Sequence, residues 1–476
     1  MRVCLVNPVV HEFGQAYDSR AAGPPLGVLY LAGVLAREGV EVEVVDQAGE
    51  WLSDAALIDR VKRCDPDVVG FSTLTANGAV AARQAFMLKN WNPNLKIVFG
   101  GYHATINGHR VLGKYPFIDY VIRGEGEYSL PVLVEALQKG GGVSEIREVP
   151  GIIYRENGVI KYGAEERGVR NLDELPFPDR RLILDNDYGY ISGTKMPKFT
   201  FILTSRGCPY NCTYCSCAAF TKRRINLRSV GNVLDELEEI ESLGYRNVLF
   251  TDDNFTVNRR RVIEICKGIR KRKIDLNWIA EGRVDSAHFD MLKAMADAGC
   301  KIIYYGVESG NQRILDYYRK GTRVEQAVDA VEKARRAGID IITATFIVGA
   351  PGETLKEVAD TLKFAQKLDI DFPQFNILAA IPGAKIYDDL AAAGYINVEE
   401  TWESAPNVAS FHPDCVPEKT LNQLILKYYR EFAMRKEFIF KEVLRTLSSG
   451  YRLKLVVSNL KSSRVFYNQL TGAFSS

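Results

Sequence analysis

The chain has 476 residues, of which 46% are hydrophobic and 25% charged, and its formal net charge is +2. This length exceeds one ordinary domain, and the composition is that of an ordered globular protein rather than a disordered or fibrous one. The small net charge gives no general attraction for nucleic acid, and no apolar run reaches the ~20 residues that cross a bilayer. The apolar start is too short for a signal sequence, and four of the nine cysteines cluster near residue 210 instead of forming an even framework. We therefore expect a cytoplasmic protein that does not act on nucleic acid.

Residues 1–140 alternate short apolar runs with helical stretches, as a parallel sheet with crossover helices does. Strands are predicted at 3–7, 40–46, 68–72 and 97–100, and helices at 27–38 and 79–90. This pattern predicts a Rossmann-like domain, in which ligands bind at the carboxyl ends of the strands. The loops at those ends contain Ser72, Leu74, Thr75, Gly100, Gly101, His103, Gly124 and Glu125.

A hairpin-rich connector is expected at 141–198, because its prolines interrupt regular structure. The alternation of strands and helices then resumes over 199–390. Six strands are predicted, at 199–204, 246–251, 277–282, 301–307, 341–348 and 374–380. Six such units form a partial (β/α)6 barrel of the TIM type, whose working face is the carboxyl end of the strands. Residues 391–476 are predicted to form a small helical region, basic and aromatic from about Leu421.

Three cysteines follow the first barrel strand with a spacing suited to an iron-sulfur cluster. Cys208, Cys212 and Cys215 lie within Arg206-Gly-Cys-Pro-Tyr-Asn-Cys-Thr-Tyr-Cys215. Their thiolates would bind three irons of a 4Fe-4S cluster, and the fourth iron would stay open for a substrate or cofactor. The competing interpretation is a structural zinc site, but zinc usually takes four protein ligands in paired groups, and no matching pair lies nearby.

This cysteine motif, with an aromatic residue before the last ligand, resembles the radical S-adenosylmethionine (SAM) superfamily. The resemblance implies that the reduced cluster gives one electron to SAM, which splits into methionine and a 5′-deoxyadenosyl radical that abstracts hydrogen from an unactivated carbon. It also implies that loops at the strand ends line SAM. Its predicted neighbours are Tyr214, Asp252, Arg283, Glu308 and Gly349. For each acidic member of this set, the alternative is a helix cap or a surface ion pair.

The loops of the first domain resemble those of the cobalamin-binding domain that is fused to one large class of these enzymes. The resemblance implies that Gly100, Gly101 and Gly124 admit the nucleotide tail, next to Glu125, and that Ser72 and Thr75 offer hydroxyls to the corrin. The alternatives are a Rossmann-like module that only packs on the barrel, and a dinucleotide-binding domain. The latter is disfavoured because no Gly-x-Gly-x-x-Gly follows the first strand.

The cobalt is predicted to have no histidine ligand from this chain. Cobalamin proteins that supply one carry Asp-x-His-x-x-Gly, whereas here the first strand is followed by Asn7-Pro-Val-Val-His11. We expect base-off cobalamin, with its lower face covered by residues 74–77, including Leu74. His103 is predicted to hydrogen-bond the cofactor tail or cap a helix, with metal ligation as the alternative.

Together the resemblances imply a cobalamin-dependent radical SAM enzyme that methylates an unactivated carbon of a small molecule, lipid or tetrapyrrole. The alternative is a cyclase, oxidase or rearrangement enzyme without methyl transfer, of which the anaerobic magnesium-protoporphyrin ester cyclase is the type. Methylthiolation would need three further cluster cysteines in the first domain, which has only Cys4 and Cys64. A cobalamin-responsive regulatory protein would not need the cysteine motif.

The resemblance also implies a flavodoxin or ferredoxin as electron donor and sensitivity to oxygen. The basic, aromatic tail resembles the closing helices of cobalamin radical enzymes that act on lipids and tetrapyrroles. It predicts either a peripheral contact with an anionic membrane or a solvated helix that closes the barrel.

Overall fold

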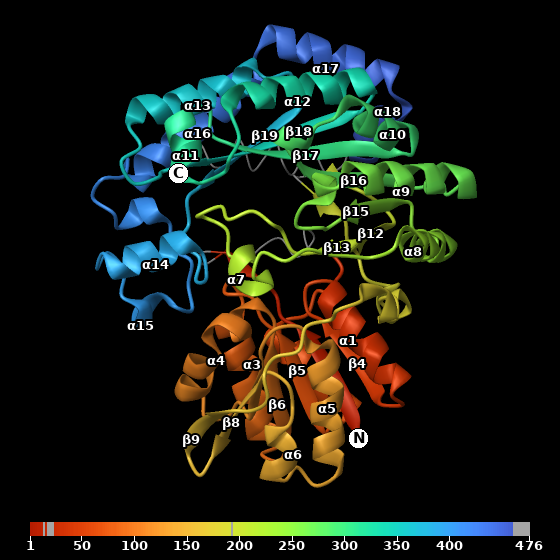
Figure 1. The fold of residues 1–476 in the computed structure, drawn as a ribbon, viewed down its shortest axis with the longest axis vertical. Coiled ribbons are helices and arrows are strands. Elements are labelled where there is room, and N and C mark those ends of the chain that lie inside the picture. The colour runs from red at the N-terminus through yellow and green to blue at the C-terminus, as the bar shows by residue number, and fades with distance from the viewer. Residues whose placement is uncertain (13–14, 17–22, 192–193, 460–476) are drawn as a thin grey trace. The chain divides into compact units, whose positions relative to one another are not determined.

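The computed structural model describes residues 1–12, 15–16, 23–191 and 194–459, and the chain forms two compact units (Figure 1). The first unit comprises Met1–Tyr188 together with Asn397–Ala405. The second comprises Gly189–Ile396 and the chain from Pro406 onward. A short segment from the carboxyl-terminal third of the chain therefore belongs to the amino-terminal unit.

The first unit is built on a seven-stranded sheet with the order β4-β1-β5-β6-β7-β8-β9. Its strands are β1 (Arg2–Asn7), β4 (Glu41–Asp46), β5 (Val68–Ser72), β6 (Lys96–Gly100), β7 (Tyr120–Ile122), β8 (Ile152–Glu156) and β9 (Val159–Tyr162). Its main helices are α1 (Leu26–Arg37), α2 (Asp54–Cys64), α3 (Gly78–Trp91), α4 (Tyr102–Lys114) and α5 (Gly126–Gln138). The first five strands in the sheet order are parallel, which confirms the predicted Rossmann-like fold.

Strands β1 and β5 are buried over most of their length, as expected for continuous apolar runs covered by helices on both faces. The core contains Phe71 and Phe99, whose rings lie 5.3 Å apart. It also contains Trp402, which comes from the Asn397–Ala405 segment.

The first unit extends past the boundary expected at residue 140. The hairpin of β8 and β9 continues its sheet, because Ile152 pairs antiparallel with Ile122 of β7. The predicted connector therefore contributes β8 and β9 to the first sheet, and the first unit runs on to Tyr188. The short strand β7 was not predicted, since its three residues give too little pattern to recognise.

The second unit contains six parallel strands in the sequential order β12-β15-β16-β17-β18-β19, which confirms the partial barrel. The strands are β12 (Phe199–Ile202), β15 (Asn247–Phe250), β16 (Asn277–Arg283), β17 (Cys300–Glu308), β18 (Ile341–Val348) and β19 (Phe372–Ile377). The helices between them are α8 (Val230–Ser242), α9 (Arg259–Arg272), α10 (Phe289–Asp297), α11 (Gln312–Tyr317), α12 (Val324–Ala337) and α13 (Leu355–Lys367).

The expected helical region begins earlier and divides between the units. It contains α14 (Lys385–Ala392), α15 (Val398–Thr401), α16 (Glu418–Ala433), α17 (Lys436–Ser448) and α18 (Gly450–Asn459). Helix α15 belongs to the first unit, whereas α16, α17 and α18 belong to the second (Figure 1). Residues 460–476 of the predicted region lie outside the described residues. None of the described helices combines the length and hydropathy needed to span a bilayer.

Candidate active site

The three predicted cluster ligands lie on the loop that follows β12 at the carboxyl end of the barrel. All three thiols are free and partly exposed. Burial raises the pKa of Cys208 and of Cys215, and in both cases the charge of Cys212 raises it further. The three cysteines lie within eight residues of one loop.

The structure forms no single-ion site at these cysteines. Among the residues that the structure describes, no three His, Cys, Asp or Glu side chains converge where one ion would be held. A 4Fe-4S cluster requires a different arrangement, because each thiolate binds its own iron at a separate corner of the cube. Cys217 is buried, and burial raises its pKa to about 12. The assignment of Cys208, Cys212 and Cys215 as cluster ligands stays a prediction.

Buried polar groups behind the loop fix its position. Asp252 is 1% exposed, and its carboxylate accepts hydrogen bonds of 2.6 Å from the Thr204 amide, the Thr204 hydroxyl and the Ser205 hydroxyl. Arg261 donates to the Thr204 carbonyl at 2.8 Å. Asp253 accepts from the Gly207 amide at 2.8 Å. Asp252 was predicted to contact SAM, but here its oxygens hold the segment that leads into the cysteine loop.

Arg283 lies next to the cysteines at the end of β16. Its Nη1 is 3.9 Å from the Sγ of Cys212, and its guanidinium stacks 3.6 Å from the ring centre of Tyr210. The same guanidinium pairs with Asp285 at 2.8 Å and donates to the Lys320 carbonyl at 2.6 Å. A fixed positive charge therefore lies beside the predicted cluster.

A buried group of three side chains joins the cysteine loop to the end of β17. Tyr214 donates a 3.0 Å hydrogen bond to Glu308 Oε1, and Lys320 Nζ lies 2.7 Å from the same oxygen. Lys320 Nζ is also 3.2 Å from the Tyr214 hydroxyl. Glu308 has φ of 67°, a left-handed conformation that a non-glycine residue rarely adopts and that often marks a functional position.

Sequence reasoning identified Tyr214 and Glu308 but missed Lys320. A lysine just after a surface helix gives no sign that it is buried.

Glu281 was missed as well, although an acid inside a strand is a recognisable signal. It lies two residues before Arg283, so both side chains are on the same face of β16. The pKa of Glu281 is raised to about 7. The main cause is the desolvation of its carboxylate by the surrounding protein, and the negative charges of Asp253 and Asp252 add to it.

Gly349 lies at the end of β18 in the left-handed conformation, with φ of 89°. Its amide donates to Glu353 Oε2 at 2.6 Å, and a Cβ here would lie only 2.8 Å from Leu421. The turn is therefore held from within the second unit, and the left-handed conformation favours glycine at this position.

In the first unit, the predicted cobalamin-contacting residues lie on neighbouring loops at the carboxyl ends of β5 and β6. Thr73 connects these loops, since its hydroxyl donates to the Gly100 carbonyl at 2.7 Å and its carbonyl accepts from the His103 amide. Gly101 has φ of 93°, and a Cβ there would lie 2.6 Å from the Thr73 carbonyl oxygen. Sequence reasoning named Ser72 and Thr75 but missed Thr73.

An apolar side chain stands exposed on the β5 loop. Leu74 is 45% exposed, while its amide donates to Asn77 Oδ1 at 2.7 Å. Asn77 is buried and donates to the Pro8 carbonyl at 3.2 Å. The loop therefore holds a leucine outward from a well-fixed backbone, which suits the apolar lower face of a base-off corrin. Ser72 and Thr75 on the same loop are partly exposed.

His103 and Glu125 have protein partners. His103 is 1% exposed, stacks on Trp402 with ring centres 5.5 Å apart, and has a pKa lowered to about 4, chiefly by burial. Glu125 accepts a 2.5 Å hydrogen bond from the Val169 amide, and the Gly124 amide donates to Thr105 Oγ1 at 3.0 Å.

Comparison with known proteins assigns a family to each unit. The sequence matches the radical SAM superfamily over residues 202–365 and the B12 binding domain over residues 18–134. It is 34% identical to an uncharacterised methyltransferase of Pyrococcus horikoshii, covering 98% of this chain and 99% of that protein. It is 29% identical to the anaerobic magnesium-protoporphyrin IX monomethyl ester cyclase of Rubrivivax gelatinosus, covering 92% of this chain and 78% of that protein.

A solved structure shares the fold. The radical SAM methyltransferase TsrM of Kitasatospora setae, with cobalamin and a 4Fe-4S cluster bound, aligns with a TM-score of 0.67 at 18% identity. The alignment covers 82% of this chain and 75% of that one.

The cysteine loop on a partial barrel and the preceding Rossmann-like domain define a radical SAM enzyme with a B12-binding domain. The chain belongs to the cobalamin-dependent radical SAM family, whose cofactors are a 4Fe-4S cluster, SAM and cobalamin.

Proposed function

We propose that this enzyme methylates an unactivated carbon of a small molecule, lipid or tetrapyrrole. The observation that carries the proposal is the likeness to a methyltransferase along almost the whole of both chains, in a protein that has both cofactor-binding domains. When bound, the cluster supplies the electron that cleaves SAM, and cobalamin supplies the methyl group for the substrate carbon. The residues of the two units bind and orient these groups.

In the second unit, we propose Cys208, Cys212 and Cys215 as the cluster ligands. Arg283 would stabilise the negative charge of the thiolates, because its guanidinium already lies beside Cys212. Glu308 is proposed to accept hydrogen bonds from the SAM ribose, with Lys320 and Tyr214 holding its carboxylate in place. Gly349 would let the backbone of its turn approach the cofactor closely.

In the first unit, we propose that Leu74 covers the lower face of cobalamin, with Ser72 and Thr75 offering hydroxyls to the corrin. Gly100, Gly101 and Gly124 would leave room for the nucleotide tail. His103 is proposed to stay neutral and stacked on Trp402. The cobalt is proposed to take no histidine from this loop. Glu125 would act indirectly, by holding Val169 beside Gly124.

We further propose a flavodoxin or ferredoxin as the external electron donor, acting in the reducing cytoplasm. The partly exposed cysteine loop supports electron entry by contact, and the nine cysteines of the described structure are all free thiols.

The experiment is anaerobic reconstitution with iron, sulfide and hydroxocobalamin, followed by mass spectrometry of the products from SAM and a strong reductant. Formation of both 5′-deoxyadenosine and S-adenosylhomocysteine is the expected result, because methylation consumes SAM in two roles. If deoxyadenosine forms alone while cobalamin is bound, the methylation proposal is wrong and a cobalamin-dependent reaction without methyl transfer takes its place. If neither product forms and no cluster assembles, the assignment of the site is wrong.

The second candidate is a cyclase, oxidase or rearrangement enzyme that uses cobalamin without methyl transfer. It is favoured by the 29% identity to the magnesium-protoporphyrin ester cyclase over 92% of this chain. The residues around the cysteine loop suit both reactions, since both begin with the same cleavage of SAM.

A further inference from the structure

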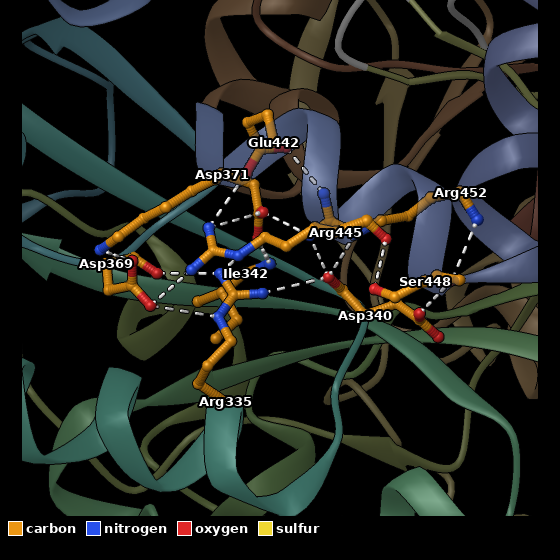
Figure 2. Close-up of polar contacts among 11 residues, drawn as sticks. Arg335, Asp340, Ile342, Asp369, Asp371, Glu442, Arg445, Ser448 and Arg452 are labelled. Atoms are coloured by element: carbon orange, nitrogen blue, oxygen red, sulfur yellow. Dashed lines mark hydrogen bonds and ion pairs between the residues drawn. The ribbon is translucent and has the colours of Figure 1, made fainter. Parts of the chain in front are cut away.

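Helices α17 and α18 turn their charged side toward the barrel. Arg445 of α17 pairs with Asp369 at 2.6 Å, and Arg452 of α18 pairs with Asp371 and with Glu442, the latter at 2.7 Å. Figure 2 shows these arginines meeting the acidic side chains at one place. Surface helices normally turn their apolar face inward and their charges outward, so this packing is reversed.

The acidic partners lie at the amino ends of the barrel strands. Asp369 and Asp371 directly precede β19, and Asp340 directly precedes β18 and accepts from Ser449 at 2.5 Å. Arg335 of α12 pairs with Asp371 at 2.7 Å, so the network also includes a barrel helix. The two helices are therefore fixed to the end of the barrel opposite the cysteine loop.

The outward side of the two helices is apolar. No residue of α17 is buried, and on α18 only Arg452 is. Phe440 is 66% exposed and Leu447 is 72% exposed. The exposed apolar residues of the pair, here called the α17–α18 face, are Ile439, Phe440, Val443, Leu444, Leu447, Leu453, Val456 and Val457. Those on α17 recur every three or four residues and so form one stripe. A patch of this kind on a soluble protein normally marks a binding surface.

Basic residues accompany the stripe. Between residues 434 and 459 the chain has six Lys and Arg against two Glu. Arg445 and Arg452 are neutralised by the barrel carboxylates. Lys436 and Lys454 are exposed and form no ion pair among the described residues. A symmetric contact with a second copy would bring two copies of this basic patch into one interface, so the lysines of both copies would add like charge there. The surrounding charge instead complements an anionic surface.

We propose that the α17–α18 face binds the surface of an anionic lipid bilayer, with its apolar stripe inserted at the level of the headgroups. The exposed Phe, Leu and Val side chains would enter the interface, and Lys436 and Lys454 would contact the lipid phosphates. The ion-pair network would hold the helices in the required orientation. This surface works in the same way whichever reaction the enzyme performs.

The test is co-sedimentation of the full-length protein with vesicles of phosphatidylglycerol and phosphatidylcholine in equal parts, compared with phosphatidylcholine alone. We expect binding to the anionic vesicles that weakens with added salt. The double variant F440E/L447E should bind at least ~100-fold more weakly, since two large apolar side chains no longer enter the lipid. The variant K436Q/K454Q should bind about fivefold more weakly per lysine removed.

The matched control is Val328→Glu, which alters an exposed apolar residue on α12 of the same barrel. It should bind as the wild type does, and all variants should retain cluster content and thermal stability, because the altered side chains are exposed. Three results would overturn the proposal: no sedimentation of the wild type with anionic vesicles, equal loss in V328E, or a wild-type dimer that F440E/L447E converts to monomer. The last would identify a second copy as the occupant.

Discussion

At the carboxyl ends of the barrel strands, the Lys320–Glu308 pair contacts Tyr214 of the cysteine loop, whereas at the amino ends Arg452 and Asp371 join two helices to the barrel. All four charged side chains are about 7% exposed. Burial of an ion pair thus does not distinguish a cofactor site from an anchor. The two pairs differ in their surroundings. The first includes the left-handed residue Glu308 and contacts the cysteine loop, whereas the second joins helices α17 and α18 to the barrel.

Replacing Cys208, Cys212 and Cys215 together by Ala should have the largest effect. Cluster absorbance and SAM cleavage should be lost entirely, because no thiolate ligand remains. The fold should survive, since the thiols are partly exposed and the loop is held by Asp252 and Thr213. Absorbance spectroscopy and circular dichroism after anaerobic reconstitution measure both properties. A reconstituted variant that still cleaved SAM would refute the ligand assignment.

The variants Glu308→Gln and Asp371→Asn compare the two ends directly. Glu308→Gln removes the carboxylate that pairs with the buried Lys320, so it should lower the free energy of unfolding by about 3 to 5 kcal/mol. Asp371→Asn should lower it less, because Arg452 keeps Glu442 and Arg445 keeps Asp369 as ion-pair partners. Only Glu308→Gln should also weaken SAM binding, measured by calorimetry on the reconstituted enzyme. If Asp371→Asn weakened SAM binding equally, the distinction between site and anchor would fail.

Asp252→Asn should have a smaller effect, at the loop itself. An amide cannot accept all three hydrogen bonds from Thr204 and Ser205, which should cost about 2 kcal/mol of stability. The electron paramagnetic resonance spectrum of the reduced cluster should broaden as the loop loses its fixed position. Asp290→Asn, which alters an exposed acid of the same barrel, is the control and should leave the spectrum unchanged. An unchanged spectrum in Asp252→Asn would remove the positioning role.

His103 gives a pH-dependent effect in the first unit. Its native pKa of about 4 lies below the usual 6.5, so the unfolded chain binds this proton more readily. The contribution of neutral His103 to the free energy of unfolding should therefore be fully present above pH 6.5. It should be lost as the pH drops toward 4, by about 3 kcal/mol in all. His103→Phe, which keeps a ring against Trp402, should flatten that slope in denaturant titrations at several pH values. An identical slope in both proteins would show that His103 is not the titrating group.

Most of the fold could be predicted from sequence because the barrel strands and the first five strands of the other sheet are parallel, and many of them are apolar runs. The strand at 68–72 was predicted with the observed bounds. The cysteine motif could likewise be predicted, because its three cysteines lie close together in the sequence. Contacts between distant segments could not be predicted. Trp402 is an example, since nothing in its local sequence places it in the core of the unit formed mainly by Met1–Tyr188.

The ion-pair network at the amino ends of the barrel strands was not predicted, for a related reason. Arg445 and Arg452 look like ordinary surface charges of basic helices, and only their partners Asp369 and Asp371, just before β19, reveal that they face inward. Lys320 is similar, since its burial depends on Glu308 and Tyr214. Sequence patterns report periodicity along one element, whereas these residues are defined by pairing between elements.

The most direct test of the central claim, that the cysteine loop with its Glu308 neighbour forms the SAM-binding site, is electron paramagnetic resonance of the reduced enzyme before and after SAM is added. The spectrum should shift on addition in the wild type and in Asp371→Asn, and shift much less in Glu308→Gln. A wild-type spectrum that does not change with SAM would contradict the account.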